Sequence, residues 1–227
     1  MTYEDLLQQI ETSEKNTTVQ EAAIAYEIHE QGTYTTEDYY ALPEEQRVEL
    51  IDGFFYDMAA PNIMHQEIAG NIYAQIAKYI DNNKGKCKPY MSPVDVKLDC
   101  DNRTMVQPDV LILCNSGKLR QWGIMGAPDF VLEVISPSTQ KKDYTIKVEK
   151  YGKAGVREYW LLDPYKQILV VFDYEHTKEA TIYSLQEHVP IQIYGGKLII
   201  DFTDILKMIA EFPTYGTDGK EDRKYEE

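Results

Sequence analysis

The chain has 227 residues, of which 43% are hydrophobic, so one α/β domain with a sizeable core is expected. Its formal net charge of −15 argues against strong non-specific binding to nucleic acid. No apolar run approaches the roughly 20 residues that a membrane-spanning helix needs. The acidic start MTYEDLLQQIETSEK does not resemble a secretory signal.

The cysteines and the charged ends refine this picture. Cys87, Cys100 and Cys114 are odd in number and have no C-x-x-C spacing, so neither a disulfide framework nor a zinc site is expected. We therefore expect a cytoplasmic protein in a reducing compartment. Residues 1–32 carry seven acids and one lysine, so much of the negative charge lies at the N-terminal end, although the central part stays acidic.

The first third of the chain is predicted to be mainly helical. Residues 1–32 read as one or two short amphipathic helices, LLQQI and VQEAAIAYEIHE, that end at Gly32. We interpret them as an extension that packs on the domain or contacts a second copy. Thr35-Thr36 followed by two acids predicts a short helix that Pro43 ends. Asp52-Gly53 then predicts a β-hairpin over residues 47–58.

The middle of the chain alternates helices with buried strands. Residues 64–82 predict a helix, because isoleucines recur at every fourth position from Ile68 to Ile80, and Gly85 follows it. A second helix is predicted over about 140–154, ending at Gly155. Apolar runs such as VLIL and FVLEVI are typical of strands buried on both faces. The strands are expected near residues 88–98, 105–114 and 129–136.

The last third is predicted to add strands and one helix. The helix is FTDILKMI, with Asp201 or Thr203 as its cap, and the polar tail from Pro213 is expected to be disordered. The strands are expected near residues 158–163, 167–173, 180–185 and 197–201. This order predicts an α/β class, with a mixed sheet flanked by helices and an additional antiparallel β layer. We expect a domain over residues 33–212, between an extension and a tail.

Two acids stand in strongly apolar strands. Glu133 lies within DFVLEVIS and Asp109 within VQPDVLIL, where an unpaired carboxylate would cost several kcal/mol. A cation, a metal or a raised pKa must compensate for each charge. If the strands are adjacent, the pair suits a hard divalent cation such as Mg²⁺ or Mn²⁺. The alternative is two unrelated acids, each paired with its own lysine or arginine.

The helix after Glu133 offers a third candidate. Lys147 and Tyr151 are four residues apart, and Asp143 lies one turn earlier. Lys147 borders an apolar stripe, so its amine could reach inward and stabilise charge in a hydrolytic transition state. It could equally be a solvated lysine. Residues 137–157 hold six basic and two acidic residues, a local basic patch that suits either a phosphate backbone or an acidic partner.

Three segments carry a resemblance to a known family. They are ALPEEQRVELIDG, VQPDVLIL and GAPDFVLEVISPSTQKKDYTIKVEKYGKAGVREYWLLDP. Together they resemble the Uma2 family, bacterial restriction-endonuclease-like proteins of the PD-(D/E)XK nuclease superfamily. The likeness runs from about Tyr34 to Phe172. It implies a restriction-endonuclease-like core fold, with residues 1–32 and the tail outside it.

The resemblance also implies roles for individual residues. The superfamily motif is Pro-Asp on one strand and Asp/Glu-x-Lys on the next. Pro108-Asp109 and Glu133 match its acids, but Ile135 stands where the lysine belongs. In Uma2-like proteins the lysine stands on the following helix, where Lys147 matches it. The backbone carbonyl of Val134 would also face the metal. Glu49, His65 and Tyr151 are accessory candidates.

The resemblance implies a metal-dependent endonuclease acting on DNA. Asp109 and Glu133 would hold Mg²⁺ or Mn²⁺, which activates a water, while Lys147 would stabilise the developing negative charge. Two other functions stay open. One is a nuclease-like fold that serves as a binding or assembly module, and the other is a phosphatase-like hydrolase with the same metal centre. A homodimer is also expected, because exposed outer strands need partners.

Overall fold

The structure is a computed structural model, and it describes residues 1–14, 30–43, 45–99, 101–177 and 179–212. At its centre is a six-stranded mixed sheet in the order β10-β9-β8-β7-β5-β3. The neighbours β7 and β8 are parallel, and the other pairs are antiparallel. The strands are β3 (Lys88–Met91), β5 (Val110–Leu113), β7 (Phe130–Val134), β8 (Glu158–Asp163), β9 (Ile168–Asp173) and β10 (Ala180–Ser184).

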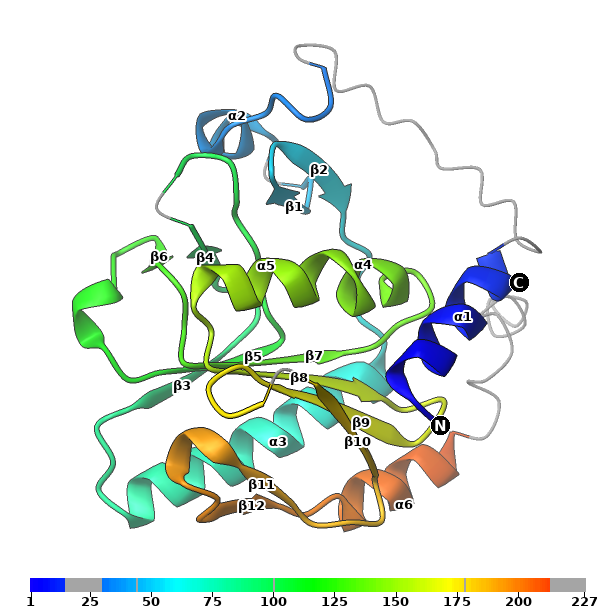
Figure 1. Ribbon diagram of the computed structural model, residues 1–227. Helices are drawn as coiled ribbons and strands as arrows, with labels where there is room; N and C mark the ends of the chain where they lie inside the picture. Colours follow the sequence, from blue (N-terminus) through cyan, green and yellow to red (C-terminus); the bar gives the residue numbers. More distant parts are fainter. Residues whose placement is uncertain (15–29, 44, 100, 178, 213–227) are drawn as a thin grey trace, which may run out of the picture.

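Helices cover both faces of this sheet (Figure 1). One face packs against α3 (Ile63–Asn82), α6 (Thr203–Glu211) and the hairpin of β11 (Val189–Ile191) and β12 (Leu198–Ile200). The other packs against α1 (Tyr3–Glu14), α4 (Gln140–Tyr144) and α5 (Ile146–Ala154). Because side chains alternate along a strand, β7 points Leu132 toward α3 and Val131 toward α5.

Smaller elements surround the face that carries α5. The helix α2 (Thr36–Ala41) and the hairpin of β1 (Val48–Ile51) and β2 (Phe54–Asp57) enclose a third, small core around Leu50. The strands β4 (Asp95–Lys97) and β6 (Gly123–Met125) form a parallel pair. Two 3-10 turns, η1 (Ser116–Lys118) and η2 (Gln192–Tyr194), lie in the connections.

Several local signals for helices and turns are confirmed, but the cap predicted for the last helix, Asp201 or Thr203, is wrong, because Phe202 is the N-cap residue of α6 (Thr203–Glu211) and its side chain makes no cap hydrogen bond. Thr35 and Asp38 form a capping box at the start of α2, which relieves unpaired backbone N–H groups. Asp52 and Gly53 have φ angles of 52° and 85°, as a tight hairpin turn between twisted strands requires. The isoleucines of α3 are buried against the sheet as the four-residue spacing predicts. The predicted α/β class is confirmed.

Several predicted boundaries are wrong. The predicted helix 140–154 breaks at Thr145, whose φ and ψ of −125° and −78° separate α4 from α5. The predicted strand 88–98 divides at the cis Ser92-Pro93 bond into β3 and β4. Strands β6 and β11 were not predicted. The described residues outside the central sheet form the antiparallel pairs β1-β2 and β11-β12, in line with the predicted antiparallel addition, and also the parallel pair β4-β6, which was not predicted.

The N-terminal extension is described in part. Its first predicted helix is confirmed as α1, which packs on α4 and β10 through the fully buried Leu6 and Ile10. The second predicted helix and the C-terminal tail lie outside the described residues. Within the described residues, none of the helices is both long and apolar enough to cross a bilayer.

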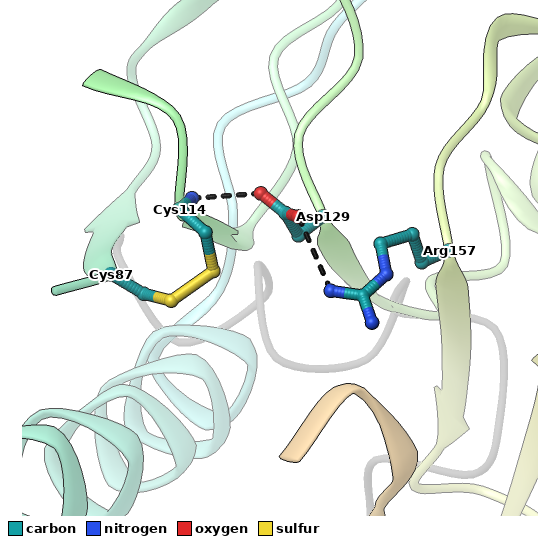
Figure 2. The surroundings of a disulfide bond; sticks show 4 residues. All are labelled: Cys87, Cys114, Asp129 and Arg157. Carbon is teal, nitrogen blue, oxygen red and sulfur yellow. Dashed lines mark hydrogen bonds and ion pairs between the residues drawn. A yellow bond between two sulfur atoms is a disulfide. The ribbon is translucent and has the colours of Figure 1, made fainter. Parts of the chain in front are cut away.

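The expectation of no disulfide is wrong. Cys87 and Cys114 are bonded, with Cα atoms 3.9 Å apart (Figure 2). The pairing of Lys88 with Leu113 between β3 and β5 brings the two cysteines face to face, although they are 27 residues apart in sequence. Cysteine spacing alone could not reveal this contact. The backbone N–H of Cys114 also donates to Asp129.

Candidate active site

Asp109 and Glu133 lie on neighbouring antiparallel strands. Because Val110 pairs with Leu132, the next position in the register sets Asp109 opposite Glu133, on the face that α5 covers. The backbone N–H of Val134 donates to Asp109 Oδ2 over 2.8 Å, which fixes the aspartate against β7. The structure therefore brings together the two acids that the sequence selected.

Glu133 is held from the helix above it. Its side chain is buried, and its Oε1 accepts hydrogen bonds from Lys147 Nζ and from the Tyr151 hydroxyl, each over 2.9 Å. Lys147 and Tyr151 are one turn apart on α5, so both point to the same spot on the sheet. Lys147 is 4% exposed, so the alternative of a solvated lysine is wrong.

Lys147 has two further carboxylate partners. Its Nζ lies 2.9 Å from Glu49 Oε1 and 3.3 Å from Asp143 Oδ1. Glu49 comes from β1, is fully buried, and also pairs with Lys142 at 2.6 Å. We call this group the carboxylate–lysine cluster. Its members are Glu49, Asp109, Glu133, Asp143, Lys142 and Lys147.

His65 contacts the Asp109 carboxylate. Its Nε2 lies 3.1 Å from Asp109 Oδ2, at the N-terminal end of α3, where Asn62 caps the helix by accepting from the backbone N–H of His65. Burial opposes the charged ring, but the hydrogen bond and charge of Asp109 raise the pKa of His65 above its usual value. Its buried Nδ1 has no hydrogen-bond partner within the described part of the chain.

The carboxylate–lysine cluster holds four carboxylates and two lysines. The lysines pair with Glu49, Glu133 and Asp143, whereas Asp109 pairs with His65. Burial raises the pKa of Glu133 to about 8; Lys147 opposes this, while Asp109, Asp143 and Glu49 add to it. Burial acts the same way on Glu49, but Lys142 and Lys147 outweigh it and lower the pKa of Glu49 to about 2. The cluster thus has an excess of acidic groups over lysines, and this excess favours the protonated, neutral form of Glu133.

This excess bears on metal binding. Among the described residues no group of three or more His, Cys, Asp or Glu side chains is arranged to hold a metal ion. A metal here would instead use the two carboxylates of Asp109 and Glu133 and the Val134 carbonyl, with water or substrate oxygens completing its shell. Mg²⁺ is commonly bound in that open manner. The excess of acidic groups is compatible with an added cation. Asp143 Oδ1 lies 3.3 Å from Lys147 Nζ and makes no hydrogen bond within the described residues.

The family of the chain follows from comparison with known proteins. The Uma2 family model, described as "Putative restriction endonuclease", matches residues 36–193. The chain belongs to the Uma2 family. The matched range contains the whole carboxylate–lysine cluster together with His65 and Tyr151, and it leaves out α1 and α6. The resemblance seen in the sequence is thereby confirmed.

A solved structure shares the fold. It is described as "a putative nuclease belonging to DUF820" from Anabaena variabilis, with a TM-score of 0.64 and 21% sequence identity. The match covers 77% of this chain and 98% of that one. No curated protein matches the chain. At this level of identity the likeness establishes the nuclease-like fold of the Uma2 protein.

The geometry also explains the departure from the superfamily motif. Ile135, at the position of the motif lysine, is buried in the core under α5. Lys147 reaches Glu133 from α5 instead. Lys142 was not predicted as a site residue, because its role depends on Glu49, which is 93 positions away in sequence. The excess of basic residues over residues 137–157 was the sequence feature that could have indicated Lys142.

Proposed function

We propose that this Uma2 protein is a nuclease that hydrolyses phosphodiester bonds in DNA with the help of Mg²⁺ or Mn²⁺. One observation carries the proposal: Lys147 Nζ lies 2.9 Å from Glu133 Oε1. Glu133 in turn lies opposite Asp109 on the paired strands β5 and β7. Two acids and a lysine at one spot are the elements of the superfamily motif. Family membership supports a nuclease, and the metal and the DNA substrate are our proposals.

Asp109, Glu133 and the Val134 carbonyl would hold the ion. When bound, such an ion supplies Lewis-acid polarisation of the phosphodiester and a water of lowered pKa. Lys147 contributes a fixed positive charge that stabilises the negative charge developing on the phosphate. The Tyr151 hydroxyl orients Glu133 through its hydrogen bond.

Two contacts position Asp109. The Val134 N–H and His65 Nε2 both bond to its Oδ2, so the carboxylate is fixed before substrate arrives. We assign His65 a positioning role, because it contacts Asp109 and reaches no other member of the carboxylate–lysine cluster by a hydrogen bond within the described residues.

A cleavage assay tests the proposal. Full-length protein is incubated with single- and double-stranded DNA and with RNA, in Mg²⁺, in Mn²⁺ and in EDTA. We expect metal-dependent cutting of DNA that Asp109→Ala and Glu133→Ala each lower by about 100-fold or more. Glu158→Gln, a buried acid on the opposite face of the sheet, serves as the control and keeps activity. Intact DNA in both metals with folded wild-type protein refutes the proposal.

The carboxylate–lysine cluster also favours a second function. Lys147 is already paired with three carboxylates in the core, as in a purely structural ion network. In that case the Uma2 protein is a binding or assembly module, and Asp109→Ala leaves its biological effect intact. Deleting residues 1–32 would then disrupt a complex, which size-exclusion chromatography detects. The homodimer stays a prediction that light scattering of the full chain tests.

A further inference from the structure

A recess in the surface is linked by hydrogen bonds to the carboxylate–lysine cluster. It is a pocket of about 400 Å³ between β4 and the segment that leads into β6. Trp122 lines it and is 42% exposed, whereas Trp160, the other tryptophan of the chain, is fully buried. The ring of Tyr40, on α2 and 53% exposed, meets Trp122 edge to face, with centroids 6.5 Å apart.

We propose that this pocket binds an unpaired base of a DNA strand whose backbone continues into the carboxylate–lysine cluster. The inference rests on the proposed nuclease function and adds the substrate class, single-stranded rather than fully paired DNA. Aromatic rings exposed at a surface recess are the usual platform for bases of a single strand.

Two short chains of contacts link the pocket wall to the site. Asp95, on its wall, accepts a hydrogen bond from Gln107 Nε2 over 2.8 Å, and the backbone N–H of Gln107 donates to Glu49 over 3.1 Å. A second link runs through the loop after β3, because the N–H of Ser92 donates to the Asp109 carbonyl and Pro93 lines the pocket. One residue therefore separates the pocket wall from the cluster along each route.

The chemistry of the wall suits a base better than a phosphate. The pocket holds one acid, Asp95, and one guanidinium, Arg120, which is fixed by the carbonyls of Gly117 and Leu119. Asp95 would repel a phosphate, but its carboxylate can accept from a base amino group. Arg47 is exposed and donates to Gln107 Oε1 over 3.3 Å, so a phosphate between the pocket and the cluster would meet a positive charge.

Pairing decides access to the pocket. A base inside a duplex presents only its edges, so it must leave the stack before its face can lie on Trp122. The net charge of −15 adds no general attraction for duplex phosphates. Binding through this pocket should therefore distinguish a single strand from the same sequence in duplex form.

The test measures binding in EDTA, where metal-dependent cutting is absent. Labelled single-stranded DNA and its duplex are titrated with full-length wild type, Trp122→Ala, Trp122→Phe and Tyr40→Ala, followed by fluorescence anisotropy. We expect Trp122→Ala to weaken single-strand binding roughly 5- to 100-fold, Tyr40→Ala to weaken it less, and Trp122→Phe to retain most of it. Ile199→Ala, on β12 and 54% exposed, is the control and changes nothing.

Three results would overturn the inference: no single-strand binding by wild type, equal affinity in Trp122→Ala, or equal loss for single strand and duplex. The readout also separates the two proposals. If the protein binds single strands through Trp122 but never cuts them, the proposed nuclease function is refuted, and the proposal that the pocket binds a base stands. Protein that cuts DNA while Trp122→Ala binds single strands normally refutes the pocket alone.

Discussion

The two faces of the central sheet each bury a glutamate, and they satisfy it differently. Glu158, on β8 and facing the α3 side, has neutral donors within the described part of the chain: the Trp160 indole N–H and the backbone N–H groups of Gln192 and Ile193. Glu133, on β7 and facing α5, has a lysine and a tyrosine as partners and further carboxylates around it.

The difference shows what marks a site. Both glutamates are buried and both have a raised pKa, with burial as the main cause. The donors to Glu158 are fixed neutral groups, and Asp173 adds only a smaller repulsion. Glu133 belongs to a cluster that holds more carboxylates than lysines, so it can exchange a proton or accept a cation. The kind of partner, more than burial, distinguishes the candidate functional acid.

The largest expected effect comes from removing the positive centre of the carboxylate–lysine cluster. Lys147→Met leaves Glu49, Glu133 and Asp143 without a shared cation, and breaking such a buried pair costs about 3–5 kcal/mol of unfolding free energy. Urea denaturation measures it. Lys153→Met is the matched control on the same helix, since its ion pair with Glu149 is exposed and is worth less than about 1 kcal/mol. Equal losses in both variants would contradict this assignment.

The next largest expected effect is the pH dependence of stability that comes from Glu158. Its folded-state pKa is raised to about 7, from an ordinary value near 4.5, with burial as the first cause. The contribution of Glu158 to the free energy of unfolding is fully present below about pH 4.5. It is lost as pH rises through about 7, and the loss amounts to up to about 3 kcal/mol. Glu158→Gln should remove this part of the pH dependence. Denaturation curves at about pH 5 and pH 8 measure it, and an unchanged slope in the variant would be inconsistent with the expected shift.

The smallest expected effect is that of the disulfide on the site. Asp109 precedes β5 and Cys114 follows it, and Asp109 is held by Val134 and His65 rather than by the disulfide. Cys87→Ser should therefore leave the Mn²⁺ affinity unchanged, as isothermal titration calorimetry would show. Alkylation of unreduced, denatured wild type should leave Cys87 and Cys114 unlabelled. A clear loss of Mn²⁺ affinity would mean that the two ends of β5 are coupled.

The sequence was most informative where structure is local. The capping box at Thr35, the Asp52-Gly53 turn and the isoleucine stripe of α3 each depend on neighbours within a few residues. The apolar setting of Asp109 and Glu133 also pointed to a shared site, because a buried carboxylate needs a nearby partner whatever the fold is. Lys147 is buried, which agrees with the prediction that its amine reaches inward.

The features that the sequence did not predict depend on distant pairings. Lys142 reaches Glu49 across 93 positions, and the disulfide depends on the register between β3 and β5. The break between α4 and α5 lies at Thr145, where no glycine or proline interrupts the apolar stripe. Glu158 was not singled out, although it is as buried as Glu133, because its donors come from η2 and from Trp160.

The central claim is that Asp109 and Glu133 together hold a divalent ion. Crystals of the full chain soaked in Mn²⁺ and measured for anomalous scattering test it directly. We predict an anomalous peak within the roughly 2.0–2.6 Å range of hard-cation coordination from carboxylate oxygens of both residues. An absent peak at saturating Mn²⁺, or a peak on other carboxylates, would contradict the claim.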